Sequence, residues 1–296
     1  MKSKNLIRYK KSLIIWIVII TLFIVFLLLN WQLIGSFSIY IILTRNHWID
    51  SVLILLSIPI FSIVAYFLGG YLLTPILIIL HKKIVGRNLM YGIKERNKPL
   101  EFKGAFLNSI FPSLFAFNFA ILLSNERWIH DMIFSTSFMS NASDAILQIL
   151  TILFLLPIVS ALGIGIFSAT YFLIDSGIMY TNKNLKKVKW GAFPTEVRSI
   201  GGYYLYFLKG YAGISVIISI VQLLINYFTS IQDLDAIIYL VNLILWPFMP
   251  FLIAIFMVPS AIIQDYSYES RNNFVKKWAK KFGITNDLED PLGLNQ

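Results

Sequence analysis

Six long apolar stretches without a central charge are the feature that most constrains how this chain can fold. Each stretch has at least the roughly 17 to 25 residues that a helix needs to cross a bilayer. Unpaired backbone groups cannot face hydrocarbon, so continuous apolar runs of this length predict helices and not barrel strands. We therefore expect an all-α polytopic membrane protein whose transmembrane domain covers residues 1–267, with six helices at about residues 12–31, 51–80, 104–124, 145–174, 205–228 and 236–263.

The connectors between these stretches carry their basic residues almost entirely on one side. Of the 25 Lys and Arg residues, all but Arg45 and Arg127 lie in the N-terminal arm or in residues 82–103, 183–209 and 271–281. The positive-inside rule then places both termini in the cytoplasm, in a multi-pass protein of the cell membrane. This insertion pattern also accounts for the net charge of +10, so we expect membrane lipids with anionic head groups as partners at the cytoplasmic face, and no nucleic acid.

Two cytoplasmic connectors share an order of residues that indicates an internal repeat. Both read M-Y-x-x-K followed by P-x-E-x-[K/R], and each runs into the next membrane helix. The recurrence predicts tandem two-helix hairpins around an axis normal to the membrane. Alternatively, tyrosine and lysine recur there only because both favour the interface. Together with Lys209, near the start of the fifth helix, these elements form the predicted cytoplasmic binding residues: Tyr91, Lys94, Glu101, Lys103, Tyr180, Lys183, Glu196, Arg198 and Lys209.

If the repeat exists, its two glutamates occupy equivalent positions. Residues two apart on a helix do not face each other, so each Glu is expected to pair with the basic residue of the other repeat. This predicts the pairs Glu101 with Arg198 and Glu196 with Lys103. The alternative is that all four are solvated surface charges that contribute under about 1 kcal/mol each.

The sixth helix is interrupted by proline near its middle. Each proline removes a backbone donor and clashes with the preceding turn, which kinks or breaks a helix. The freed carbonyls could coordinate a ligand, or the kink could simply let the helix bend around its neighbours. The predicted gate or kink consists of Pro247, Pro250 and Asn242.

The C-terminal segment, residues 268–283, predicts a basic amphipathic helix. At about 100° per residue its aromatic and aliphatic side chains fall on one arc and its lysines on the other. Such a helix can lie on the inner leaflet, or it can pack on the protein's own cytoplasmic face. The predicted membrane-surface residues are Lys276, Lys277, Trp278, Lys280 and Lys281, and residues 284–296 are expected to form a flexible acidic tail.

Chemistry-bearing motifs are missing from the sequence. The chain has no cysteine and three histidines, so neither a metal site nor a cofactor is expected. No catalytic motif occurs, and no ionisable residue lies near the centre of a predicted span, which argues against a proton-coupled pump.

These features favour a non-enzymatic accessory or scaffold subunit that engages lipid or other membrane subunits through its basic cytoplasmic loops. The alternative is a transporter or permease for a neutral or apolar small molecule. A third reading is a lipid-modifying enzyme that uses Glu101, Glu196 or Asp175 at the inner interface. Asn141 begins a glycosylation sequon in a predicted external connector and offers a check of topology.

Overall fold

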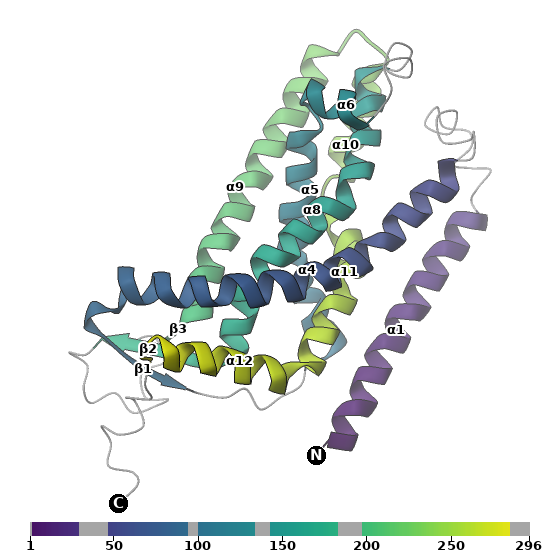
Figure 1. Cartoon of the computed structure of the whole chain (residues 1–296). Helices are drawn as coiled ribbons and strands as arrows, with labels where there is room; N and C mark the ends of the chain where they lie inside the picture. The colour runs from purple at the N-terminus through teal and green to yellow at the C-terminus, as the bar shows by residue number, and fades with distance from the viewer. Residues whose placement is uncertain (1, 30–46, 94–99, 134–142, 183–196, 285–296) are drawn as a thin grey trace, which may run out of the picture. The chain divides into compact units, whose positions relative to one another are not determined.

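The structure, a computed structural model, describes residues 2–29, 47–93, 100–133, 143–182 and 197–284. The chain is mostly helical (Figure 1) and divides into two compact units. The first unit consists of residues 1–63, 100–163 and 211–263, and the second of residues 64–99, 164–210 and 264–296. Several helices therefore contribute one end to each unit.

Five helices are long and apolar enough to cross a membrane. They lie in α4 (His47–Ile84), α5 (Phe102–Leu123), α8 (Asp144–Asp175), α9 (Ile200–Thr229) and α11 (Met249–Tyr266). The first predicted span falls mostly within α1 (Lys2–Leu29), which is not among the five, so six spans remain a prediction. Shorter helices are η1 (Gly86–Asn88), α6 (Arg127–Ile133), α10 (Asp235–Leu245) and α12 (Tyr268–Lys281).

In the first unit, α5 and α9 run parallel and are joined by amide and hydroxyl groups. Ser219 of α9 donates to the Asn118 side chain of α5, and one helical repeat further on the Nδ2 of Asn226 lies 3.3 Å from the Oδ1 of Asn125. The same oxygen accepts from Gln148 of α8 at 3.1 Å. Such hydrogen bonds hold helices together where lipid supplies no hydrophobic driving force.

The second unit contains a three-stranded antiparallel sheet, so the prediction of purely helical structure was incomplete. Its order is β1 (Leu89–Ile93), β2 (Ile178–Asn182) and β3 (Arg198–Ser199). The two M-Y elements form β1 and β2, with Tyr91 directly opposite Tyr180. Each strand is only two to five residues long: β1 and β2 follow helix ends, and β3 directly precedes α9. Their backbone groups find partners only in the other strands of the sheet. That pairing is not visible in local periodicity.

Glycines set the closest helix approaches in the second unit. A Cβ on Gly69 of α4 would lie 2.1 Å from the carbonyl oxygen of Gly165 in α8, so the backbones meet there. A Cβ on Gly201 would lie 2.5 Å from the carbonyl oxygen of Thr170. Helix α9 accordingly begins at Ile200, five residues before the predicted start of the fifth span, because these residues pack as helix against α8.

Candidate functional site

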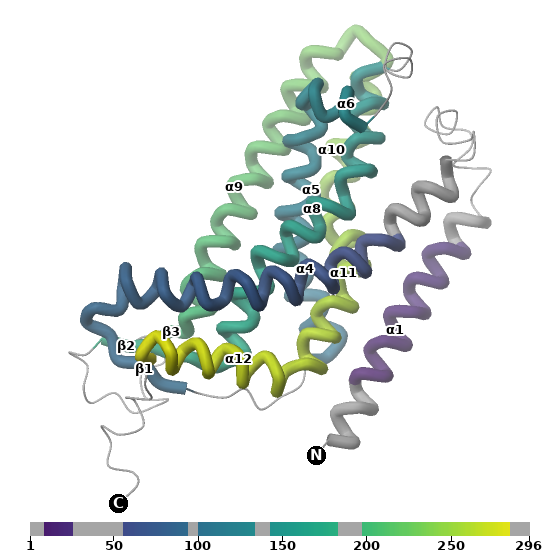
Figure 2. Tube along the Cα trace, in the orientation of Figure 1, coloured from purple at the N-terminus to yellow at the C-terminus, as the bar shows by residue number. Residues whose placement is uncertain are grey.

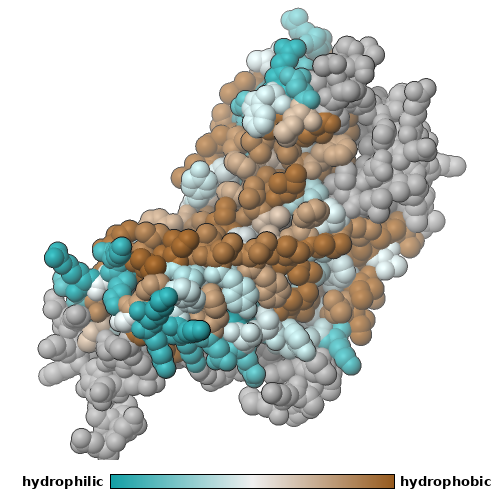
Figure 3. Space-filling view, viewed as in Figure 1, coloured by the Kyte–Doolittle hydropathy of each residue, from teal (hydrophilic) through white to brown (hydrophobic). Residues whose placement is uncertain are grey.

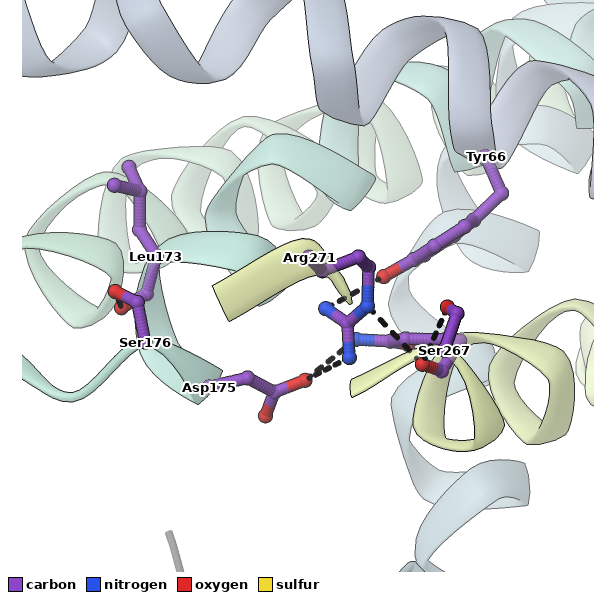
Figure 4. Close-up of polar contacts among 7 residues, drawn as sticks. Tyr66, Leu173, Asp175, Ser176, Ser267 and Arg271 are labelled. Carbon is purple, nitrogen blue, oxygen red and sulfur yellow. Dashed lines mark hydrogen bonds and ion pairs between the residues drawn. The ribbon is translucent and has the colours of Figure 1, made fainter. Parts of the chain in front are cut away.

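A buried arginine fixes the start of α12. Arg271 is 1% exposed, and its Nη2 lies 3.0 Å from the Oδ2 of Asp175, the last residue of α8. Its Nε donates to the carbonyl oxygen of Gln264 at 3.0 Å, and its Nη1 lies 3.4 Å from the hydroxyl of Tyr66 in α4 (Figure 4). One side chain thus connects α12 with α4, α8 and α11.

The groups around this arginine complete a desolvated ion-pair site. The side-chain amide of Gln264 donates to the same Asp175 oxygen at 3.0 Å, and the guanidinium carbon lies 4.7 Å from the centre of the Phe172 ring. A guanidinium suits this role because its donors diverge in a plane and its face stacks on aromatic rings. Removing one member would leave a buried charge without compensation. The site can therefore hold α12 in one position.

The other end of α12 is held by a lysine of α4. The ammonium of Lys82 donates to the carbonyl of Phe282 and, at 3.0 Å, to that of Gly283. Gly283 has a φ of +68°, and the amide of Ile284 donates to the carbonyl of Ala279 at 2.9 Å, which is a Schellman C-cap. A cation at the negative end of a helix is favourable.

Between these two ends, α12 lies alongside the C-terminal half of α4. Their successive contacts, Tyr66 with Arg271, Tyr71 with Phe274 and Lys82 with Phe282, increase together along both helices, so the two run parallel (Figure 2). The Tyr71 and Phe274 ring centres are 4.7 Å apart. On the predicted apolar arc of α12, Val275 and Ala279 are buried within the protein.

The predicted membrane-surface residues lie on the rest of α12. Lys277, Lys280 and Lys281 are exposed, Lys276 and Trp278 are half-buried, and the Lys281 ammonium lies 4.5 Å from the centre of the Trp278 ring. Figure 3 shows hydrophilic residues gathered over α12 beside an apolar band along α4. Whether these lysines meet a membrane surface stays a prediction.

A second cluster surrounds His81, which is fully buried near the end of α4. Its ring centre lies 4.6 Å from that of Tyr180 and 5.5 Å from that of Tyr203, and its Nδ1 lies 3.3 Å from the hydroxyl of Tyr91. Burial, with a smaller contribution from Tyr180, raises the pKa of Tyr91 to about 12. Burial also raises the pKa of Tyr180, against the opposing effect of the Arg198 guanidinium. The cluster joins the sheet to α4 and α9 through contacts between aromatic rings.

The structure brings some of the predicted cytoplasmic residues together. Tyr91 and Tyr180 face each other across β1 and β2, and Arg198 lies opposite Tyr180 on β3. Lys209 is exposed on α9. Glu101 and Lys103 belong to the first unit, and Lys94, Lys183 and Glu196 lie outside the described residues. The pairs Glu101 with Arg198 and Glu196 with Lys103 therefore stay predictions.

The predicted interruption of the sixth helix is present, in the first unit. Helix α10 ends at Leu245 and α11 begins at Met249, so Pro247 lies in the break and Pro250 in the first turn of α11, where proline is tolerated. The Nδ2 of Asn242 and the Nε1 of Trp246, one turn apart, are buried without a hydrogen-bond partner among the described residues. Two unsatisfied donors thus accompany the freed carbonyls of the break.

Sequence reasoning missed the roles of Arg271, Asp175 and His81. Arg271 was grouped with the C-terminal basic residues, although it lies four residues before Val275 and eight before Ala279, on the apolar side of the helix. That position was the available signal. Within the ranges that the structure describes, no group of three or more His, Cys, Asp or Glu side chains could hold a metal ion.

Comparisons of the chain with protein-family models, with curated proteins and with solved structures find no match. The apolar helices indicate a membrane protein, and any finer function rests on the sites described above.

Proposed function

We propose that this chain is a non-enzymatic accessory or scaffold subunit of the cell membrane, which engages anionic lipid head groups or partner membrane proteins through basic residues at its cytoplasmic face. The observation that carries the proposal is the fixation of α12 at both ends. The ion pair of Arg271 with Asp175 fixes the start of α12, and Lys82 caps its end. The helix keeps three exposed lysines, Lys277, Lys280 and Lys281.

A lysine-bearing helix that is held in this way is suited to binding. Each Lys near an anionic leaflet contributes about 1 kcal/mol of attraction. The contacts of Arg271 and Lys82 already order the backbone of α12, so the binding of a partner does not have to order it again. Neither the Arg271 contact nor the Lys82 contact requires a reacting group or a bound cofactor, which fits a role in assembly.

The predicted topology belongs to the same proposal. Both termini would be cytoplasmic, with six spans built as tandem hairpins. Two observations support it. The second unit contains most of the basic connectors, in residues 64–99, 164–210 and 264–296. Tyr91 lies opposite Tyr180, as a two-fold arrangement of equivalent strands requires.

Gentle purification from the native membrane tests the role. The Lys280→Gln, Lys281→Gln double variant should lose most of the anionic lipid or partner protein that co-purifies with the wild type. The Lys10→Gln, Lys11→Gln variant removes the same charge from the N-terminal arm and should retain it. Equal retention by both variants would contradict a role for α12.

A transporter for a neutral solute is the second candidate, and the break between α10 and α11 is the observation that favours it. The buried donors of Asn242 and Trp246 could bind a hydroxyl or carbonyl oxygen of a solute. Proteoliposomes exposed to a glycerol gradient should then swell faster than empty liposomes, and Asn242→Leu should remove the difference. Swelling no faster than in empty liposomes would count against a glycerol-sized path.

A further inference from the structure

Helix α4 is too long for a simple membrane crossing. It has 38 residues, which at ~1.5 Å per residue extend about 57 Å, whereas the hydrocarbon core of a bilayer is ~30 Å thick. The two units divide this helix between Ile63 and Val64. The half that belongs to the second unit, residues 64–84, therefore needs a placement of its own.

The exposed side of residues 64–84 is apolar except at its C-terminal end, where Lys83 is exposed. Aliphatic side chains at every fourth position, 41% to 74% exposed, wind along this half of the helix: Val64, Leu68, Leu72, Ile76, Leu80 and Ile84. Monomeric soluble surfaces rarely carry a continuous apolar patch of this kind. Water is therefore a poor environment for this face.

A crossing of the bilayer is equally unfavourable for this half, because α12 runs beside it. The contacts from Tyr66 with Arg271 to Lys82 with Phe282 cover the length of α12. If residues 64–84 stood upright in the membrane, α12 would stand with them, and Lys277, Lys280 and Lys281 would lie at membrane depth. Exposed lysines there are costly and would need partners.

We propose that residues 64–84 lie in the plane of the membrane interface, with their exposed apolar side on the acyl chains of one leaflet and α12 on the water side. The pair then behaves as one amphipathic layer, in which α4 supplies the apolar face and α12 the lysines at head-group level. Tyr206, exposed near the start of α9 in the same unit, is of a residue type that favours this layer. The inference requires a bilayer and does not depend on the accessory role, and it confines the second predicted span to the part of α4 before residue 64.

The absence of cysteine from the chain permits a direct test with single spin labels. Cysteines are introduced one at a time for Leu68, Leu72, Ile76 and Leu80, and the labelled full-length protein is reconstituted in liposomes of phosphatidylcholine and phosphatidylglycerol. Power saturation by oxygen and by a nickel chelate gives the depth of each label. A matched scan at Ile214, Ile218, Val221 and Ile225, exposed positions of α9, gives the profile of a crossing helix.

We expect the four α4 labels to lie at similar shallow depths, with a spread below the ~10 Å diameter of a helix. A label at Lys277 should be accessible to the nickel chelate. A depth that changes steadily by ~1.5 Å per residue, as in the α9 scan, would overturn the proposal in favour of a crossing. Labels that meet neither oxygen nor the chelate would also overturn it, since a second copy or a partner protein would then cover this face.

Discussion

Arg271 joins helices that are far apart in the sequence, since its guanidinium contacts Tyr66, Asp175, Gln264 and the ring of Phe172. A buried ion pair need not stabilise a protein more than apolar residues of the same volume would. Its expected role is to define the position of α12, because moving this helix would separate the two buried charges. Replacing one partner of the pair should therefore destabilise the protein more than replacing both partners by apolar residues.

Replacing Arg271 by Met should destabilise the protein by about 3 to 5 kcal/mol, because the buried Asp175 loses the cation that compensates its charge. The midpoint of thermal unfolding in detergent, followed by intrinsic fluorescence, measures the change. Lys277→Met on the exposed side of the same helix should stay within about 0.5 kcal/mol of the wild type. Adding Asp175→Leu to Arg271→Met should restore part of the loss, and a double variant no more stable than the single one would disprove the coupling.

Tyr91 makes the second unit sensitive to alkaline pH. Its pKa of about 12 lies above the value near 10 expected for an unfolded chain, so folding favours the neutral phenol. This contribution is fully present below pH ~10 and is lost as the pH rises through about 12, because the unfolded chain releases its proton first. Unfolding midpoints measured from pH 9 to 12 should fall less steeply in Tyr91→Phe than in the wild type. Parallel curves would show that Tyr91 does not contribute.

At the scale of elements, the glycine contact between α4 and α8 is the tightest approach described in the second unit. Gly69→Ala would place a methyl group against the backbone of Gly165, and overpacking of this kind costs about 1 to 3 kcal/mol. Gly210→Ala in α9 is the matched control, because no atom lies within 4 Å of its added methyl and helix propensity favours alanine by up to ~1 kcal/mol. The midpoint of thermal unfolding should be lower for Gly69→Ala than for Gly210→Ala. Similar midpoints would mean that α4 and α8 can move apart at Gly69 without loss of stability.

The membrane helices could be predicted because their signal is local. Residues 104–124 and 145–174 were expected to be spans, and α5 and α8 begin and end within two residues of those limits. The sheet could not be predicted in this way, because β1 and β2 are short and their pairing joins segments 89 residues apart at Tyr91 and Tyr180. The ion pair of Arg271 was missed for the same reason, since Asp175 precedes it by 96 residues.

On the scale of the whole molecule, the predicted orientation follows from the distribution of charge and can be tested at positions that the structure describes. In intact cells, a membrane-impermeant maleimide should label Glu126→Cys and Asp233→Cys, which lie in predicted external connectors. Lys10→Cys and Asn273→Cys should be labelled only after the cells are permeabilised. Labelling of either of the latter two in intact cells would refute the placement of that terminus in the cytoplasm.

The distance in sequence between Asp175 and Arg271 also has a consequence for biosynthesis. A ribosome translates Asp175 well before the arginine, so the carboxylate has no guanidinium beside it until residue 271 has been made. The ion pair of the second unit can therefore form only after residue 271 has been translated. A chain that stops before residue 271 would keep the side-chain amide of Gln264 beside Asp175 but would lack the guanidinium that fixes the start of α12.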